Sequence, residues 1–211
     1  MNVSPHSQLE SLEGRLAAVS TAYLMGIAAI DLFSNATARS MLVGRYVTFG
    51  QGGLSFGPQF DAGTISVSLD QIAHLLANPK NHLESVKQFS VVLLCDLITM
   101  GFQLLEERCE AVDVMKDLKA TSFYQFARII RNCVSHNFRI EYGNFDKSLM
   151  PLSWRGLTLT LPMDGGPLPL DFFGWSHAWT LHMDYVIYAR ALDARLGIAP
   201  YPNHPVTPPA R

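Results

Sequence analysis

The sequence predicts a mainly α-helical fold, a bundle of four to five helices with a small β-hairpin insertion before the C-terminal helix. Apolar residues recur at three- and four-residue steps along most of the chain, as in helices that bury one face. Alternation of apolar and polar residues replaces this spacing in LSWRGLTLTLP at 152–162, which indicates short paired strands. Because 48% of the 211 residues are hydrophobic, the chain can bury one substantial core. We therefore expect a single domain over residues 1–197.

The first predicted helix runs from about Gln8 to Leu42, with a break near Ser34 and Asn35. Its apolar stretch at 16–30 is shorter than the roughly 18 residues that a membrane span needs, and charged residues bound it. Its acidic start is wrong for a signal peptide, so we expect a buried core helix and no membrane contact. The glycine-rich stretch at 44–60 lacks the G-K-[ST] of a phosphate-binding loop, and its alternating flanks favour a small hairpin.

Four more stretches belong to this outline. A short helix begins at Ser68 and ends at about Ala77, because Pro79 disfavours a helical residue before it. A long helix covers about 81–110, with the broad apolar stripe of a central bundle helix. Helical spacing returns from about 174 to 196. The tail 198–211 carries five of the twelve prolines and no apolar periodicity, so we expect it to be disordered.

The segment FYQFARIIRNCVSHNFRI carries the most informative residues, on a helix predicted at about 122–137. Arg131 is followed directly by Asn132, and His136 comes five residues after Arg131. Arginine is a fixed cation with forked donors for a phosphate, and histidine exchanges a proton near neutral pH. Arg128, Asn132 and His136 also form a polar row at four-residue steps. This combination indicates RNA cleavage without a metal.

Helical geometry limits how these residues can act together. At about 100° per residue, Arg131 and His136 point about 140° apart on one helix. A symmetric pair of such helices would bring two arginines and two histidines into one cleft. Thr121 or Ser122 is expected to cap the start of the helix.

A structural role is the alternative for this motif. The arginine-to-histidine spacing alone should arise by chance in roughly one chain in four of this length, and the adjacent asparagine lowers this to roughly one in a hundred. A lone histidine on a helix is more often solvated or hydrogen-bonded than catalytic, and Arg131 could pair with an acidic neighbour. The motif favours an enzyme and leaves a structural role open.

Charge along the chain agrees with a site near the motif. The formal net charge is only −2, so any RNA contact must be a local basic patch. Five cations lie around the motif with two acids, Glu141 and Asp146, which leaves an excess of three. The cations are Arg128, Arg131, Arg139, Lys147 and Arg155. The segment 106–113 is acidic and would repel a phosphate chain. We expect Arg128, Asn137 and Arg139 to contact RNA, with a solvated charged face as the alternative.

The sequence predicts no metal site and no cofactor. Cys95, Cys109 and Cys133 show no metal-ligand spacing, and neither C-x-x-C nor H-E-x-x-H occurs. The odd number of cysteines and their largely apolar neighbours suit buried thiols in a reducing cytoplasm. We therefore expect a cytoplasmic protein.

Through Arg131, Asn132 and His136 the chain resembles the HEPN superfamily, whose motif is R-x4-6-H with a polar residue after the arginine. The predicted order of helices, with a small β insertion before the last one, is similar to that of HEPN domains. The resemblance implies a ribonuclease site at these three positions, shared between the copies of a dimer. It also implies a toxin or anti-phage defence effector, with an antitoxin or a regulatory protein as a partner.

Two features of that family leave alternatives open. It includes non-cleaving members, so a non-catalytic module that binds RNA or protein is the alternative function. One subset, paired with nucleotidyltransferase antitoxins, has R-x4-H-x-Y with a modified tyrosine. Here Phe138 takes that place and cannot accept AMP, although Tyr142 lies nearby.

Overall fold

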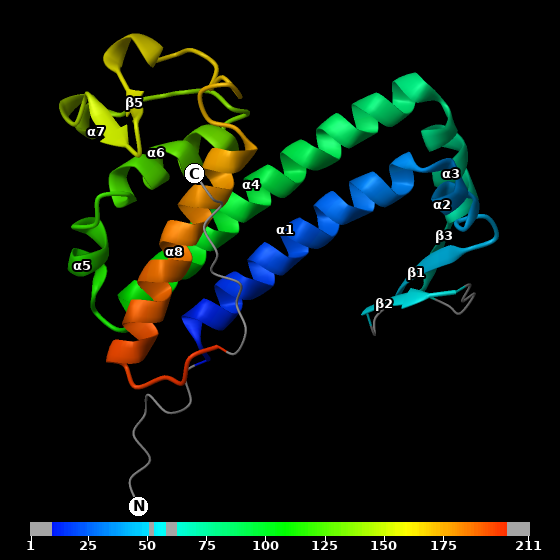
Figure 1. The fold of residues 1–211 in the computed structure, drawn as a ribbon, viewed down its shortest axis with the longest axis horizontal. Coiled ribbons are helices and arrows are strands. Elements are labelled where there is room, and N and C mark those ends of the chain that lie inside the picture. Colours follow the sequence, from blue (N-terminus) through cyan, green and yellow to red (C-terminus); the bar gives the residue numbers. More distant parts are fainter. Residues whose placement is uncertain (1–9, 51–52, 58–62, 202–211) are drawn as a thin grey trace, which may run out of the picture. The chain divides into compact units, whose positions relative to one another are not determined.

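The computed structural model describes residues 10–50, 53–57 and 63–201 (Figure 1). Within them the chain is mainly helical and has two small antiparallel sheets, one of them a hairpin before the C-terminal helix. This confirms the predicted mainly α fold with its small β insertion. The chain forms two compact units, Met1–Tyr23 with Leu94–Arg211, and Leu24–Leu93. The single domain expected over 1–197 stays a prediction, and residues 202–211 of the expected disordered tail lie outside the described residues.

The elements have the following bounds. The helices are α1 (Leu12–Ser34), α2 (Ala36–Ser40), α3 (Leu69–Ala77), α4 (Pro79–Ala111), α5 (Met115–Lys119), α6 (Tyr124–Ser135), α7 (Asn144–Ser148) and α8 (Trp175–Arg195), with a 3-10 turn at Leu161–Met163. The strands are β1 (Tyr46–Gly50), β2 (Gly53–Phe56), β3 (Ile65–Ser68), β4 (Leu152–Trp154) and β5 (Leu157–Leu159). The first sheet has the order β2-β1-β3, and β4 pairs with β5.

Local signals set several of these ends. Asn35 breaks the first helix as predicted, because its side-chain oxygen accepts the N–H of Thr37 at 2.8 Å and starts α2. The predicted cap of α6 is wrong. Phe123 holds that position without a side-chain bond, and the Thr121 hydroxyl donates backward to the Leu118 carbonyl at 2.8 Å.

The unit formed by residues 24–93 contains the three-stranded sheet, whose polar face is the buried one. Thr48 is 1% exposed, and its hydroxyl lies 2.6 Å from both the Gly57 carbonyl and the Ser66 hydroxyl. Because strand residues alternate between faces, Phe49 and its cross-strand partner Ile65 share the opposite face. Both are exposed, so the apolar face of this sheet does not form a core among the described residues.

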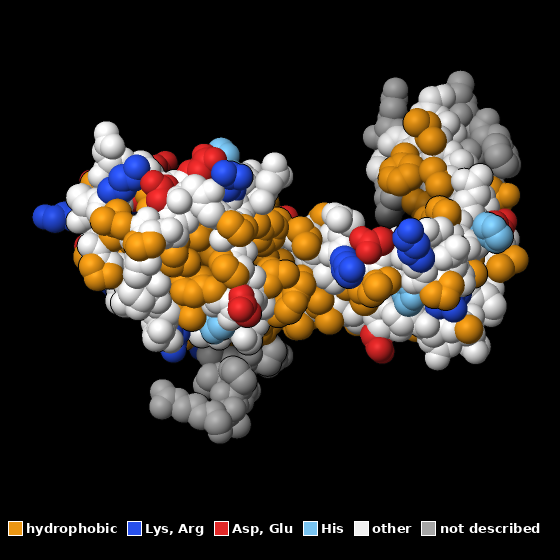
Figure 2. Space-filling model, turned by 90° about the horizontal axis from the view of Figure 1, so that it is seen from above, with side chains coloured by type: hydrophobic (Ala, Val, Ile, Leu, Met, Phe, Trp, Pro, Cys, Tyr) orange, Lys and Arg blue, Asp and Glu red, His pale blue; other side chains and the backbone are white. Residues whose placement is uncertain are grey.

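Helix α1 is buried along one side only. Leu16 and Tyr23 belong to the core, whereas Leu24 and Met25 are 48% and 68% exposed. The expected core helix therefore contributes to the core through one side only. Both α1 and α4 are long and apolar enough to cross a membrane, by length and composition alone, and the core helix of a soluble protein meets the same criteria. Hydrophobic side chains accordingly reach the surface in broad patches in Figure 2.

The other unit packs α6 and α8 against the ends of α1 and α4 that belong to it. Phe126 on α6 is fully buried between the rings of Trp154, at 5.1 Å, and Phe173, at 6.2 Å. Gly101 allows α4 to approach α8 closely, since a Cβ there would lie 2.8 Å from Nδ1 of His182. This core holds α6 in place and so positions the motif.

A buried carboxylate on α8 holds the first turn of α1. The Oδ2 atom of Asp193 accepts the Ser11 hydroxyl at 2.8 Å and the Glu13 backbone N–H at 2.9 Å. Asp193 is 1% exposed and its bond with the Glu13 N–H is buried, so this N–H would lose its partner without gaining water if the carboxylate were removed. Glu13 is tied to α8 a second time, because Nε of Arg190 donates to its Oε1 at 2.9 Å.

Replacing Asp193 by alanine is expected to lower the free energy of unfolding by about 2–3 kcal/mol, because a buried donor loses its acceptor. Urea unfolding followed by circular dichroism measures the change. Asp117 provides the matched control, since it is 54% exposed in an ion pair with Arg195. Its replacement by alanine should change the free energy by less than about 1 kcal/mol. Equal losses from the two variants would contradict this account of α1.

Candidate functional site

His136 lies immediately after the last residue of α6. Its backbone N–H donates to the carbonyls of Asn132 at 3.0 Å and Cys133 at 3.1 Å, which closes the last turn. Asn137 and Phe138 follow with φ values of 54° and 57°. Asparagine tolerates this left-handed region, whereas it is rare for phenylalanine. The two residues turn the chain away from the helix axis and leave the exposed imidazole at the helix end.

Three of the predicted site residues gather around one open pocket at this helix end. His136, Asn137 and Arg139 line a volume of about 650 Å³. The remaining lining residues are Ser135, Phe138, Glu141 and Pro167. The Arg139 side chain is 63% exposed and lies 3.8 Å from Glu141, a loose ion pair between solvated groups. The pocket therefore offers an imidazole beside a guanidinium that an anion can recruit.

Arg131 faces α4 instead of this pocket. One of its terminal nitrogens lies 3.4 Å from Oε2 of Glu106, and its guanidinium carbon lies 5.4 Å from the centre of the Phe102 ring. The other Glu106 oxygen accepts the Tyr124 hydroxyl at 2.8 Å. Burial, and then this bond to Glu106, raise the pKa of Tyr124, so its hydroxyl keeps the proton that it donates. Arg131 and His136 of one chain thus point to different surroundings, as their spacing predicts.

Arg128 and Asn132 also lie on α6. Arg128 forms an ion pair with Asp146, and its Nε donates to the Gln125 side chain at 3.1 Å. Its guanidinium carbon also lies 5.5 Å from the centre of the Phe145 ring. Asn132 is half-buried. Neither residue is among those that line the pocket at His136.

Each cation counted around the motif has a carboxylate partner. The pairs are Arg128–Asp146, Arg131–Glu106, Arg139–Glu141, Lys147–Asp164 and Arg155–Asp184. Three of these acids come from parts of the chain outside the stretch in which the charges were counted. The excess of three positive charges is therefore compensated in the fold. The acidic segment 106–113, expected to repel RNA, supplies Glu106 to the motif arginine.

Tyr142 is closed off in this fold. The residue is 6% exposed, and among the described residues its hydroxyl has no hydrogen-bond partner. Burial raises the pKa of the Tyr142 hydroxyl to about 12. A buried, protonated hydroxyl is a poor acceptor for a nucleotidyl group. Tyr142 is therefore unsuited to take the place of the modified tyrosine in that HEPN subset.

No pattern in the sequence predicted the buried serine–histidine pair of the same unit. Nε2 of His182 on α8 lies 2.8 Å from the Ser20 hydroxyl on α1, and the two residues are 0% and 3% exposed. A substrate cannot reach a pair that is closed in this way, so we assign it to the packing of α1 on α8. Among the described residues, no three or more His, Cys, Asp or Glu side chains form a group suited to a metal ion.

The cysteines are expected to react slowly with a thiol reagent at pH 8. Cys109 and Cys133 are buried, and burial raises the pKa of Cys133 to about 12 and that of Cys109 above its ordinary value. Since the thiolate is the reactive form, a raised pKa leaves very little of it at this pH. Titration with DTNB should detect Cys95 first, because it is half-buried, and all three thiols only in denaturant. Rapid reaction of three thiols in the native protein would contradict this.

Comparison with models of protein families, with curated proteins and with solved structures found no match for this chain.

Proposed function

We propose that this chain is a metal-independent endoribonuclease of the HEPN type, acting as a homodimer with His136 as its acid–base residue. The observation that carries the proposal is the pocket at the end of α6, where an exposed imidazole lies beside Asn137 and the loosely paired Arg139. A group that exchanges protons, next to a cation that a phosphate can recruit, is the minimum equipment for cleaving an RNA backbone. The R-N-x3-H spacing supports the same reading.

The proposed reaction is an internal transfer at phosphorus. An imidazole takes the proton of a ribose 2′-hydroxyl, and the 2′-oxygen forms a bond to the adjacent phosphorus. The bond from phosphorus to the 5′-oxygen breaks, and that oxygen leaves with the electron pair and receives a proton. The products are a 2′,3′-cyclic phosphate and a free 5′-hydroxyl, and the step consumes no water. Two imidazoles in one cleft would let one act as base while the other acts as acid.

Arg131 is assigned to the charge that builds on the phosphate, and Asn132 to orienting the histidine or the substrate. Because Arg131 of one chain faces Glu106 and Phe102, it reaches a phosphate near His136 most directly when two copies share the cleft. The phosphate would then compete with Glu106 for the guanidinium. Arg128, Asn137 and Arg139 are proposed to hold the RNA on either side.

The first experiment is incubation of the purified protein with a mixed RNA pool in EDTA. Arg131→Ala and His136→Ala proteins are incubated in parallel. We expect cleavage by the parent alone, with cyclic-phosphate ends. Cleavage at the parental rate by both variants would assign the activity to another site or to a contaminant, and no cleavage by the parent would favour a binding function.

A cellular role follows from the same proposal. A ribonuclease of this kind would act in the cytoplasm as a toxin or an anti-phage effector, restrained by an antitoxin or a regulatory protein. Growth of cells that express the protein tests this role. Growth arrest that disappears with Arg131→Ala supports it, and arrest that persists with this variant contradicts it.

The second candidate is a non-catalytic module that binds RNA or protein. The observation that favours it is the pairing of Arg131 with Glu106, which occupies the motif arginine in the single chain. Such a module would retard RNA in a gel shift without cleaving it. The gel shift is therefore run on the parent protein in EDTA, and RNA recovered intact from the shifted band would favour binding over catalysis.

A further inference from the structure

The pocket at the end of α6 contains a carboxylate to which the proposed reaction gives no role. Glu141 lines the same volume of about 650 Å³ as His136. Among the lining residues, His136, Arg139 and Glu141 carry the titratable or charged side chains. Cleavage of an RNA backbone uses one group that accepts a proton and one that donates a proton. A carboxylate and an imidazole in one pocket supply both kinds of group from a single chain.

The extended segment 139–142 carries Glu141 on the side that borders the pocket. Ile140 and Tyr142 are buried, at 0% and 6% exposed. Arg139 and Glu141, which alternate with them, are exposed and both line the pocket. Successive side chains of an extended chain point to opposite sides, so the two buried residues fix the direction of the two exposed ones. The cation and the carboxylate therefore point toward the same open space.

Hydrogen bonds hold the backbone on both sides of Glu141. The Ile140 N–H donates to the Gly166 carbonyl at 2.8 Å, and the Ile140 carbonyl accepts the N–H of the preceding glycine at 2.7 Å. On the other side, the Tyr142 N–H donates to Oδ1 of Asp164 at 2.9 Å. The carboxylate is therefore presented from a fixed point of the chain, opposite the end of α6.

The Glu141 carboxylate is open to a substrate. Its side chain is 61% exposed, and Nε of Arg139 lies 3.8 Å from its Oε1. An exposed ion pair of this length is weak. A phosphate that binds the Arg139 guanidinium competes for the same cation, and this leaves the carboxylate oxygens free to accept a proton.

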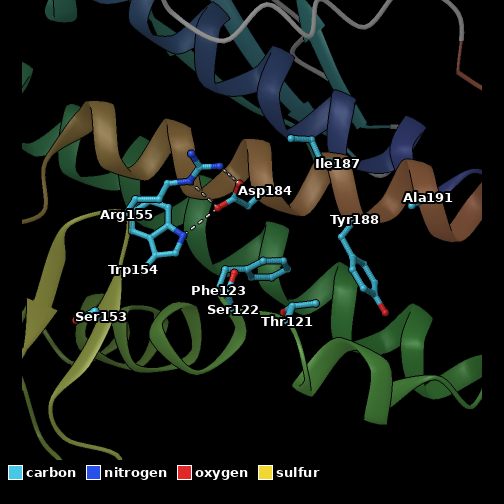
Figure 3. A pocket seen from close by; sticks show the side chains of 10 residues that line it. All are labelled: Thr121, Ser122, Phe123, Ser153, Trp154, Arg155, Asp184, Ile187, Tyr188 and Ala191. Carbon is cyan, nitrogen blue, oxygen red and sulfur yellow. Dashed lines mark hydrogen bonds and ion pairs between the residues drawn. The ribbon is translucent and has the colours of Figure 1, made fainter. Parts of the chain in front are cut away.

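Asp184 in a second pocket shows the opposite arrangement (Figure 3). That pocket, of about 610 Å³, lies at the start of α6, and Trp154, Arg155 and Asp184 are among the residues that line it. Nε and a terminal nitrogen of Arg155 lie 3.1 and 2.6 Å from the two Asp184 oxygens. The Trp154 indole N–H donates to the same carboxylate at 2.9 Å. Donors therefore occupy both oxygens of Asp184, whereas the ion pair of Glu141 is loose.

A carboxylate and an imidazole also hold the required protons at the same pH. Carboxyl groups lose their proton at a lower pH than imidazolium groups do, so between these two ranges the carboxylate accepts a proton while the imidazolium donates one. The thiol of Cys133 does not compete, because burial raises its pKa to about 12. The charged groups of α6, α7 and the turn at 164 are paired, as Arg128–Asp146, Arg131–Glu106 and Lys147–Asp164.

We propose that Glu141 is the base of the cleavage reaction and that the imidazolium of His136 is its acid. This assignment rests on the proposed function, and it replaces the second imidazole with a carboxylate of the same chain. Glu141 takes the proton of the ribose 2′-hydroxyl, and the 2′-oxygen bonds to phosphorus. The bond from phosphorus to the 5′-oxygen breaks, and this oxygen leaves with the electron pair and takes the proton of His136. Glu141 then gives its proton to water and His136 gains one from water, which restores both groups.

Two RNA substrates separate the base from the acid. One is an ordinary labelled RNA, and the other carries sulfur in place of the bridging 5′-oxygen at one linkage. Because thiols are much stronger acids than alcohols, the sulfur leaves without a proton, and this RNA needs a base but no acid. Single-turnover cleavage rates in EDTA are measured for the parent, Glu141→Gln and His136→Ala. Circular dichroism checks that each variant is folded.

We expect Glu141→Gln to cleave both RNAs about 10²–10⁴-fold more slowly than the parent, the contribution of one positioned base. His136→Ala should be similarly slow on the ordinary RNA and close to the parental rate on the sulfur-containing RNA. Glu84→Gln is the matched control, since the Glu84 side chain is 57% exposed and paired with Lys87 at 3.2 Å on α4. It should cleave both RNAs at the parental rate.

Three outcomes would overturn the assignment and leave the proposed function in place. Glu141→Gln cleaves the ordinary RNA at the parental rate or no more slowly than Glu84→Gln does, or the sulfur-containing RNA restores the rate of Glu141→Gln, or His136→Ala stays slow on that RNA. Failure of the parent to cleave either RNA would instead remove the proposed function itself, and the base with it.

Discussion

Replacing His136 by alanine is expected to lower the rate of RNA cleavage about 10²–10⁴-fold, the contribution of one positioned acid or base. The side chain is exposed at the end of α6 and takes no part in the core, so the fold should stay intact. Single-turnover cleavage of a labelled RNA in EDTA measures the rate. Circular dichroism and the thermal midpoint should match those of the parent.

His74 on α3 supplies the matched control for this prediction. It is likewise an exposed histidine, and it lies outside the motif. His74→Ala should cleave at the parental rate, which separates the loss of a catalytic imidazole from any effect of removing surface histidine. Parental cleavage by His136→Ala would instead remove His136 from the reaction, whatever the fate of Arg131.

Replacing Phe126 by alanine is expected to lower the free energy of unfolding by about 3–5 kcal/mol, because it removes a large buried ring and leaves a cavity. Phe126 is fully buried and packs between Trp154 and Phe173, so one ring joins α6, β4 and the segment before α8. Urea unfolding monitored by tryptophan fluorescence measures the loss, and Trp154 reports on the site itself.

Phe145→Ala is the matched control, because it makes the same substitution at an exposed phenylalanine. Phe145 is 59% exposed on α7, where it contacts the Arg128 guanidinium. Its removal gives up only that contact and some exposed surface, so we expect a loss of about 1 kcal/mol or less. A loss of similar size from both variants would show that the buried ring cluster does not hold this unit together.

Periodicity predicted the long helices because each must bury a stripe of side chains to be stable. It placed α4 and α8 within two residues of their observed ends, and the alternation at 152–162 located the β4–β5 hairpin. The five-residue helices α5 and α7 were missed, since so short a segment cannot complete two turns of an apolar pattern. The cap of α6 was missed because Thr121 and Phe123 adopt a turn that no local rule distinguishes from a helix start.

One part of the candidate site could likewise be predicted from the sequence, and another part could not. His136, Asn137 and Arg139 lie together because they are neighbours in sequence at one helix end, so their grouping was determined by the sequence itself. The carboxylate partners of the arginines could not be predicted from neighbouring residues, since Glu106 approaches Arg131 from α4, 25 residues earlier. Asp184 approaches Arg155 from α8, 29 residues later.

By itself the sequence determined the mainly helical fold, the hairpin and the residues that can exchange protons at the end of α6. Those properties depend on spacing along one segment, which side-chain chemistry and helix geometry set locally. Only the tertiary structure decided which charges are compensated, that Tyr142 is closed off, and that Trp154, Arg155 and Asp184 form part of a second pocket. Burial and charge pairing depend on segments far apart in sequence, and only the fold brings those segments together.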